Sequence, residues 1–394
     1  MKWNVVDVVM VLAASQGVFL AILIFHKHRK IFANRFLGLL MLCFSIILYN
    51  LSLSDLGYQA RFPRLTLFLI GVPFIAIPLH FLYARYLIHV SDRFTARELL
   101  HFMPFGLYVL SIVPLLLKSQ EAVRMLFRDQ DIRQLPVVFI LFNWTVTAMG
   151  LVYMLLTVSM LARYVRRIKN EFSTIDKIKL DWLRNMTVMI AFAWASFFLE
   201  NMLLLFKINL SNFTFSSFMV SVFVYAMGYL GLLKTEVFTI PEIADSIRRI
   251  PAADEADPGR IPGPDPKTGI KYEKSGLSPE KAKEILEALL RFMETDKPYA
   301  DCDLTLAQLA KRLSVTPHNL SEVINTRTGH NFYDFINQYR VEQVKKDLAD
   351  HSKRDFKLLA IGLDAGFNSK TTFNTIFKRH TRLTPSGYRE KLLR

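Results

Sequence analysis

The chain has 394 residues and combines 52% hydrophobic residues, including 32 Phe, with a formal net charge of +15. A single soluble core does not explain both properties, whereas a membrane region joined to basic loops and to a basic domain with an anionic partner does. The two cysteines, Cys43 and Cys302, cannot form a disulfide framework or a zinc cluster. The sequence has no HExxH motif and no glycine-rich phosphate loop, so we expect no metal, no cofactor and no enzymatic activity.

Seven apolar runs occupy the first 235 residues and predict a bundle of transmembrane helices over residues 1–235, because a span requires roughly 20 residues. The runs cover residues 5–25, 36–53, 65–88, 99–117, 135–161, 186–206 and 213–233. The first run is followed by HKHRK instead of a small-residue cleavage site, which argues against a cleaved signal peptide. Prolines fall inside the third and fourth runs, where we expect kinks.

Basic residues are distributed unevenly between the loops that join these runs. Loops one, three and five hold fourteen Lys and Arg residues, whereas the amino terminus and the even-numbered loops hold eight. Because basic loops tend to face the cytoplasm, this excess places the odd loops inside and the amino terminus outside. Seven spans then deliver the carboxyl end to the cytoplasm. We therefore expect a multi-pass membrane protein whose last domain is cytoplasmic.

Polar residues inside apolar runs are costly unless they are paired or functional. Asn143, Glu200 and Asn201 lie in the outer parts of the fifth and sixth runs. One hypothesis is that they line a pocket that receives a small-molecule or envelope signal. The alternative, which we favour, is that the two asparagines form hydrogen bonds between helices and that Glu200 is protonated. His80, in the third run, is expected to be a packing residue.

A membrane transporter or enzyme that carries a fused regulatory DNA-binding domain is the competing interpretation. A transporter would more often show an internal repeat with broken helices in matching halves, and neither is evident in the sequence. An enzyme would require a metal cluster, a nucleophile with its base, or a repeated acidic motif, and the runs contain none of these. Turnover in proteoliposomes would favour these classes over a receptor.

Residues 236–276 are expected to form a juxtamembrane piece followed by a linker. From residue 251 to residue 276 the sequence is polar and contains five prolines, a composition that stays extended and does not pack a core. Because such a linker transmits no torque, we expect a signal to act by changing homodimerisation of the spans. The last domain, residues 277–394, then opens with an amphipathic helix behind the N-cap Ser278.

A first helix-turn-helix pattern begins at Leu304. Apolar residues recur at helical spacing up to Leu313, and a break at Ser314 separates them from a second helix. That helix opens with Thr316 as N-cap and with Pro317 at the first helical position, which needs no amide hydrogen. Its outward face carries short polar side chains, which suit base edges in a DNA major groove.

A second pattern of the same kind follows a spacer helix. Gly366 supplies the turn and Ser369 caps the next helix, whose outward face includes Thr372. The helix before the turn is expected to pack through Leu358, Leu359 and Ile361. Two recognition helices held by one rigid helix can enter successive major grooves, roughly 34 Å apart.

The outward faces of the two recognition helices supply the candidate DNA contacts. A basic carboxyl end supports this reading, because from Asn368 onward seven basic residues stand against Glu390 alone. The expected base contacts are His318, Ser321, Glu322, Lys370, Thr371, Asn374 and Thr375, and the expected phosphate contacts are Asn325, Arg327, Arg340, Lys378, Arg379 and Arg389.

The same residues resemble the DNA-binding domain of the AraC/XylS regulators. The resemblance is carried by LxLxxLAxxLxVxPxxLSxxIN from Leu304, NFYDFINxYR from Asn331, AGFxSxxxFxxxFK from Ala365 and TPxxYR from Thr384. It covers about the last 115 residues. Two positions depart from the family pattern. A glycine at 362 replaces a small alanine and should loosen its helix by up to about 1 kcal/mol, and an arginine at 382 replaces a glycine and adds a candidate phosphate contact.

The resemblance implies a fold and a function. The expected fold is all-α, with a seven-helix transmembrane bundle followed by a cytoplasmic double helix-turn-helix domain. The expected protein is a one-component transcription regulator of the bacterial inner (cytoplasmic) membrane. Such a protein would sense a signal through its spans, bind promoter DNA sequence-specifically, and recruit or block RNA polymerase. Its partner by resemblance would be double-stranded DNA. The apolar runs add the lipid bilayer, and the linker argument above adds a second copy of the chain.

Overall fold

The computed structural model describes residues 5–27, 31–53, 57–89, 93–128, 137–176, 178–206, 215–233 and 277–393. These residues divide into two compact units. The first comprises Met1–Ala162 and Leu180–Arg249, and the second comprises Arg163–Lys179 and Ile250–Arg394. The linker expected over residues 236–276 lies outside the described residues. The second unit is discontinuous in sequence, because a short stretch from the middle of the chain belongs to it.

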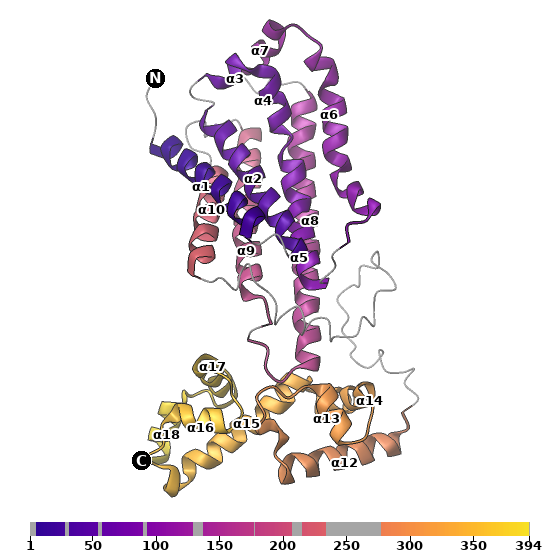
Figure 1. The fold of residues 1–394 in the computed structure, drawn as a ribbon, viewed down its shortest axis with the longest axis vertical. Coiled ribbons are helices and arrows are strands. Elements are labelled where there is room, and N and C mark those ends of the chain that lie inside the picture. The colour runs from indigo at the N-terminus through magenta and orange to yellow at the C-terminus, as the bar shows by residue number, and fades with distance from the viewer. Residues whose placement is uncertain are drawn as a thin grey trace. The chain divides into compact units, whose positions relative to one another are not determined.

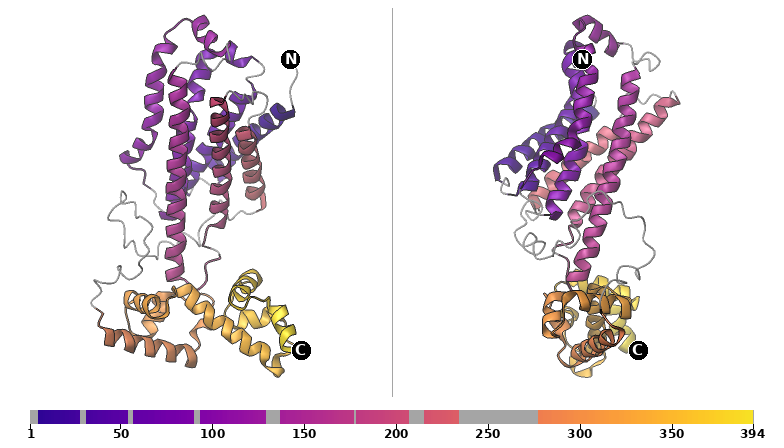
Figure 2. Two further views of the ribbon diagram at one scale, coloured as in Figure 1. Left: turned by 180° about the vertical axis from the view of Figure 1, so that it is seen from behind. Right: turned by 90° about the vertical axis from the view of Figure 1, so that its right-hand side faces the viewer.

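The first unit is helical, and the described residues as a whole contain no strand, which confirms the expected all-α class (Figures 1 and 2). Its helices are α1 (Val5–Lys27), α2 (Phe32–Ser52), α3 (Tyr58–Arg61), α4 (Pro63–Ile70), α5 (Pro73–His89), the 3-10 helix η1 (Ala96–Phe102), α6 (Met103–Leu116), α7 (Gln120–Arg128), α8 (Val137–Glu171), α9 (Asp181–Leu205) and α10 (Phe215–Leu233). Helix α1 packs against α2 and α10, α2 packs against α5, and α9 packs against α10. The last part of α8, from Arg163, belongs to the second unit.

Six stretches of the described residues are helical, long and apolar enough to cross a membrane. By length and composition these are Val5–Lys27, Phe32–Ser52, Pro63–His89, Ala96–Leu116, Leu141–Glu171 and Asp181–Leu203. The sequence predicted seven spans. The seventh run falls on α10, of which Phe215–Leu230 is described as a shorter apolar helix, and the first two residues of the run lie outside the described residues. The seventh span therefore stays a prediction.

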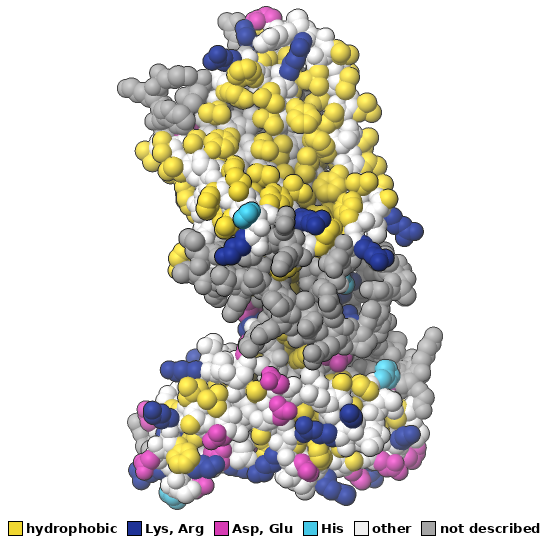
Figure 3. Space-filling model, viewed as in Figure 1, with side chains coloured by type: hydrophobic (Ala, Val, Ile, Leu, Met, Phe, Trp, Pro, Cys, Tyr) yellow, Lys and Arg dark blue, Asp and Glu magenta, His cyan; other side chains and the backbone are white. Residues whose placement is uncertain are grey.

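The outside of the first unit is strongly apolar. In Figure 3, hydrophobic side chains cover most of the visible surface of this unit, with Lys and Arg at the edges of the apolar band. Leu110, Leu151 and Phe192 are 68%, 62% and 63% exposed, although these residue types are usually buried in soluble proteins. Such a surface is favourable against an apolar surrounding such as lipid.

The third apolar run is interrupted where the sequence predicted a kink. Helix α4 ends at Ile70, and α5 begins at Pro73 after a short turn. The ring of Tyr108 packs against Gly71 so closely that a Cβ there would lie 2.5 Å from it. The Tyr108 hydroxyl donates to the carbonyl of Leu67 at 2.5 Å. Glycine thus makes room for the ring, and the tyrosine satisfies a carbonyl near the end of α4.

The second unit contains residues 163–179 and the carboxyl-terminal helices. These helices are α12 (Pro279–Thr295), the 3-10 helix η5 (Pro298–Ala300), α13 (Leu306–Arg312), α14 (Pro317–Val323) with a π-helical turn (Ile324–Thr328), α15 (Phe332–Ala349), the 3-10 helix η7 (His351–Lys353), α16 (Leu358–Asp364), α17 (Lys370–Thr381) and α18 (Pro385–Leu393). The predicted cap at Ser278 is confirmed, because its hydroxyl accepts the N–H of Lys281 at 3.3 Å.

Helix α15 connects two small helical groups, one at each of its ends (Figure 1). The first group, α12 to α14, packs on α15 through a cluster that includes Leu289 and Leu320, both 0% exposed. In the second group, α16 to α18, the ring of Phe373 lies 5.4 Å from that of Phe367 and 5.9 Å from that of Phe377. Helix α15 packs against α16, α17 and α18 as well as against the first group, so it holds the two groups in a defined arrangement.

Candidate nucleic-acid interface

Helix α14 begins as the sequence predicted for a recognition helix. The Thr316 hydroxyl accepts the N–H of Asn319 at 3.2 Å, and Pro317 occupies the first helical position. The helix continues through its π-helical turn and ends at Gly329, where φ is +71°, a conformation that favours a residue without Cβ. The cap leaves the first turn of α14 ordered and accessible to an anion or a base.

Three residues of α14 were expected to read bases, and their exposure differs. His318 is exposed and Ser321 is half-buried, as an outward face requires. Glu322 is only 8% exposed, so the expectation that it lies on the outward face is wrong. Its carboxylate oxygen lies 4.0 Å from Nδ1 of His318, one turn earlier on the same helix. Glu322 therefore lies on the same side of the helix as His318, beyond hydrogen-bond distance of the imidazole.

Helix α17 is capped as predicted and presents most of its expected contacts. Ser369 Oγ accepts the N–H of Thr372 at 3.2 Å, and Gly366 makes the preceding turn with φ of +97°. The outward side of the helix carries the predicted base contacts, of which Lys370, Thr371 and Thr375 are exposed and Asn374 is half-buried. The first turn of α17 thus combines a lysine with small hydroxyl side chains, a set that can contact both bases and phosphates.

The glycine at 362 has a packing role that the sequence did not reveal. It was expected to loosen α16, but a Cβ at Gly362 would lie 2.8 Å from the ring of Phe373 in α17. The absence of a side chain therefore allows close packing of the recognition helix on α16. In the same helix Ile361 is 1% exposed, whereas Leu359 is 38% exposed, so the expectation that Leu359 packs inward is wrong. Its neighbours Leu358 and Ala360 are half-buried, so Leu359 lies near the border between the buried and exposed sides of α16. Helical spacing alone does not predict the orientation of a residue at that border.

Arg340 was expected to contact a phosphate, and the structure contradicts this. The side chain is 1% exposed. Its Nε donates to the carbonyl of Tyr299 at 2.8 Å, and its Nη2 donates to the carbonyl of Asp301 at 2.9 Å. Burial lowers the pKa of its guanidinium to about 10, which keeps it charged at neutral pH. Arg340 is therefore an internal donor that joins segments of the unit.

The other expected phosphate contacts fall into two groups. Arg327, in the π-helical turn, and Lys378, on α17, are both exposed. Three residues have internal partners: Arg379 Nη2 lies 2.6 Å from Asp334 Oδ1, Arg389 Nη2 donates to the carbonyl of Phe356 at 2.9 Å, and Asn325 Nδ2 donates to the carbonyl of Ser321 at 2.8 Å. For these three, a phosphate would have to be added to or exchanged for a bond already present.

Residues 172–179, which join α8 to α9, were missed by the sequence reasoning. They were counted as part of a basic loop, yet Ser173 is 1% exposed and lies within the second unit. Thr372 was expected on the outward face of α17, but it is 9% exposed because its hydroxyl donates to the carboxylate of Asp176. The sequence signal is weak: a short polar and acidic stretch, EFSTID, interrupts the basic loop.

Two of the three residues proposed as a signal pocket, Glu200 and Asn201, form local hydrogen bonds. Glu200 accepts the backbone N–H of Ser216 at 2.8 Å and its hydroxyl at 2.6 Å, and so caps the start of α10. Asn201 Nδ2 donates to the carbonyl of Phe197 at 2.8 Å, within its own helix. Asn143 is half-buried on α8. The bond of Asn201 is within its own helix and not between helices, as we had favoured, whereas Glu200 does join α9 to α10. The pocket stays a prediction.

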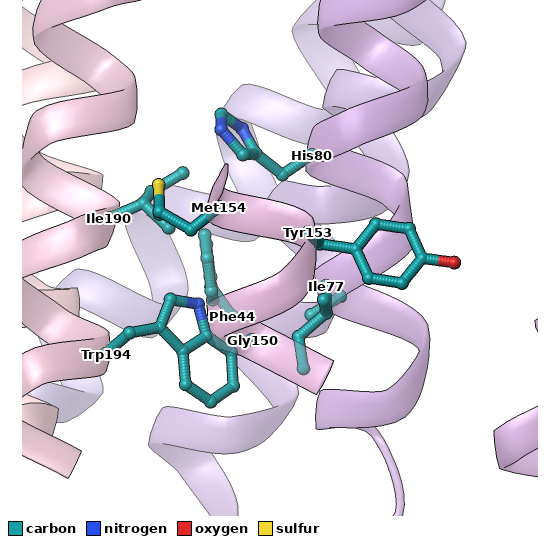
Figure 4. A pocket seen from close by; sticks show the side chains of 9 residues that line it. Phe44, Ile77, His80, Gly150, Tyr153, Met154, Ile190 and Trp194 are labelled. Carbon is teal, nitrogen blue, oxygen red and sulfur yellow. The ribbon is translucent and has the colours of Figure 1, made fainter. Parts of the chain in front are cut away.

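A small cavity lies elsewhere in the first unit, between α2, α5, α8 and α9 (Figure 4). Its lining includes His80, Met154 and Trp194, and Asn143, Glu200 and Asn201 are not part of it. Its volume is about 10 Å³, which is room for about one water molecule. His80 Nε2 lies 3.4 Å from the hydroxyl of Thr187 on α9, in agreement with a packing role. The cavity is too small for an organic ligand.

Comparisons with known proteins bear on the carboxyl-terminal helices. A family model described as a helix-turn-helix domain matches residues 309–391. An uncharacterized HTH-type transcriptional regulator of Staphylococcus aureus (strain COL) is 33% identical over 87 residues, which cover 22% of this chain and 11% of that protein. The probable transcription factor PqrA of Proteus vulgaris is 25% identical over 109 residues, which cover 28% of this chain and 86% of that protein.

Among solved structures, the C-terminal domain of AraT, a response regulator from Geobacillus stearothermophilus, matches with 27% identity and a TM-score of 0.24, over 30% of this chain and 88% of that one. The chain spans only about a tenth of the Staphylococcus relative's length, 11%. The family match nevertheless confirms that the carboxyl-terminal part contains a helix-turn-helix domain, as the two capped recognition helices indicate.

Proposed function

We propose that this protein is a membrane-anchored, one-component transcription regulator that binds duplex DNA through α14 and α17. The observation that carries the proposal is the pair of N-capped helices held at the two ends of α15, each with exposed polar side chains in its first turns. Helix pairs of this kind place side chains in successive major grooves. The proteins to which this part of the chain is similar are named as transcription factors or regulators.

The proposed base contacts are a subset of those expected from the sequence. They are His318 and Ser321 on α14, with Lys370, Thr371, Asn374 and Thr375 on α17. The buried Glu322 is not among them, and Arg327 and Lys378 are the proposed phosphate contacts. Base contacts specify sequence, whereas phosphate contacts set position and salt dependence. The two sets therefore predict different mutant behaviour.

Lys370→Ala tests the assignment of α17. The full-length protein in lipid nanodiscs is used to enrich duplexes from a random-sequence library, and the enriched duplex is titrated with each variant. We expect Lys370→Ala to weaken binding by about 1–3 kcal/mol at one subsite and to relax sequence preference there. Lys378→Ala should weaken binding to every sequence. If Lys370→Ala preserves both affinity and preference, α17 does not read bases at this position.

Lys283→Ala is the matched control for this experiment. Lys283 lies on α12, and its side chain is 76% exposed. The Lys283→Ala variant removes the same charge as Lys370→Ala, but at a position away from both recognition helices. We expect its affinity and preference to match those of the wild type. A loss as large as that of Lys370→Ala would mean that only net charge is being measured.

The apolar surface of the first unit supports a location in a membrane. The distribution of basic residues favours an orientation with the odd loops and the carboxyl end in the cytoplasm, where DNA is accessible. By the sequence resemblance, the bound protein would recruit or block RNA polymerase. Homodimerisation of the spans is proposed on another ground, namely that the linker transmits no torque. The spans would receive the signal, and Glu200→Ala tests the expected pocket. We expect a changed signal response with unchanged DNA affinity, whereas an unchanged dose response would leave Glu200 only its role as a cap of α10.

A further inference from the structure

Residues 172–179, which we call the α8–α9 segment, are a buried part of the second unit. Ser173, Ile175 and Ile178 are 1%, 5% and 7% exposed, and residue 177 lies outside the described residues. In sequence the segment follows α8 and precedes α9, two of the long apolar helices. Its burial therefore ties a stretch of chain between two candidate spans to the helix-turn-helix domain.

The segment first contacts the amino-terminal helix-turn-helix group. Phe172 forms an isolated antiparallel bridge with Thr305, and the N–H of Ser173 donates to the carbonyl of Leu304 at 3.2 Å. Thr305 is the N-cap of α13, so the bridge lies at the entrance of that helix. Backbone pairing of this kind does not depend on long flexible side chains.

The segment next contacts α15, through Arg340. The guanidinium donates from Nη1 to the carbonyl of Ser173 at 3.1 Å and from Nη2 to its hydroxyl at 3.1 Å. Nη1 also lies 3.3 Å from the hydroxyl of Thr174. One turn earlier, Lys169 lies over the ring of Tyr333 on α15, 5.6 Å from its centroid. The side chain that joins α15 to the segment before α13 thus also binds the α8–α9 segment.

The segment ends at the second recognition helix. The carboxylate of Asp176 accepts a hydrogen bond from the hydroxyl of Thr372, in the first turn of α17. Burial and the nearby Asp176 carboxylate raise the pKa of Tyr333 to about 12. The first turn of a recognition helix is where a DNA phosphate is favoured, because N–H groups and the helix dipole attract an anion.

We propose that the α8–α9 segment is an intrachain competitor of DNA that holds the helix-turn-helix domain in an inhibited state. Asp176 lies at the first turn of α17, where a phosphate would approach. Two anions in such close proximity, a carboxylate and a phosphate, repel each other. The inference rests on the proposed DNA binding. The segment is joined covalently to α8 and α9, so a movement of those helices can withdraw it. The signal then needs no torque from residues 236–276.

A reversible cross-link tests whether the docked segment and DNA exclude each other. Phe172→Cys and Thr305→Cys are introduced in a Cys43→Ser, Cys302→Ser background, because opposed residues of an antiparallel bridge are close enough for a disulfide. The full-length protein is placed in lipid nanodiscs, and the reduced form enriches duplexes from a random-sequence library. The enriched duplex is then titrated with oxidised and reduced protein, which share the same substitutions.

The expected result is a loss of affinity on oxidation of at least about tenfold, or about 1.4 kcal/mol, restored by dithiothreitol. Equal affinities of the two forms overturn the inhibition and leave the proposed DNA binding intact. Failure of every form, including the wild type, to enrich any duplex overturns the proposed function itself. Failure of the cysteines to cross-link overturns the docked position of the segment.

A charge reversal gives a second, independent measurement. Asp176→Lys should bind the same duplex about tenfold more tightly than the wild type, because it removes the competing carboxylate. Asp181→Lys is the matched control: it changes the charge equally, five residues on, where the carboxylate pairs with Arg184 on its own helix at 3.2 Å. Equal gains in both variants would mean that affinity depends only on the net charge of the protein. A loss of binding in Asp176→Lys would mean that the segment supports DNA binding. Either result overturns the proposal.

Discussion

At the scale of single residues, three non-glycine residues of the described part of the helix-turn-helix domain have a positive φ, namely Lys297, Ser314 and Arg382, and Arg382 has the largest value. Arg382 ends α17 with φ of +66°, in the left-handed region, at a position where the family pattern has glycine. A residue with a Cβ is destabilised there by roughly 1–2 kcal/mol relative to glycine. The turn nevertheless forms, and its N–H donates to the carbonyl of Lys378 at 2.9 Å.

Arg382→Gly should therefore stabilise the helix-turn-helix domain by about 1 kcal/mol. The measurement is the urea concentration at the midpoint of unfolding of that domain in the full-length protein. Limited proteolysis at increasing urea concentrations monitors the unfolding. Arg382→Ala is the control, since it removes the same charge and keeps the strained backbone. If the alanine variant is stabilised as much as the glycine variant, charge repulsion in the basic carboxyl end explains the gain.

At the scale of elements, α15 does more than separate the two groups. Its Arg340 satisfies carbonyls of the segment before α13 and of the α8–α9 segment at once. Planar guanidinium groups can donate in several fixed directions, which an ammonium cannot reproduce. The arginine is therefore a structural residue whose loss would affect the whole unit.

Arg340→Lys should lower the unfolding free energy of the domain by at least about 2 kcal/mol, because buried carbonyls lose their donors. Arg327→Lys, an exposed change of the same kind, should change it by less than about 0.5 kcal/mol. Urea unfolding of the two full-length variants measures both. A stable Arg340→Lys variant with reduced DNA affinity would return the residue to the phosphate contacts.

The same elements show what a sequence can and cannot predict. The caps at Ser278, Thr316 and Ser369 were predictable because a cap depends on residues three positions apart. The burial of Glu322 and Arg340 was not, because helical periodicity does not show which distant segments cover a given face. The Asp176 contact joins residues that are 196 positions apart, and local patterns contain no information on it.

At the scale of the whole molecule, the amino-terminal helices and the carboxyl-terminal domain require different surroundings. Exposed hydrophobic side chains form much of the visible surface of the first unit, whereas charged side chains of both signs are scattered over that of the second (Figure 3). The distribution of basic loops predicts which side of a membrane each loop occupies.

Reporter fusions test this orientation. A phosphatase that is active only outside the cytoplasm should be active when it is fused after residue 128, in the loop after the fourth run, and inactive when it is fused at the carboxyl end. A cytoplasmic fluorescent reporter should give the opposite pattern, and a fusion after Lys27 is the internal control for a cytoplasmic loop. An active phosphatase at the carboxyl end would contradict both the orientation and DNA binding inside the cell.

The discontinuous second unit also changes what a proteolytic cut would achieve. A regulator tied to the bilayer by a tether alone is set free by one cleavage within residues 236–276. Here Phe172, Ser173 and Asp176 hold the domain without any covalent bond from that tether. A nicked chain would therefore keep both fragments together and sediment with membranes, so liberation of the carboxyl-terminal fragment requires undocking as well as scission.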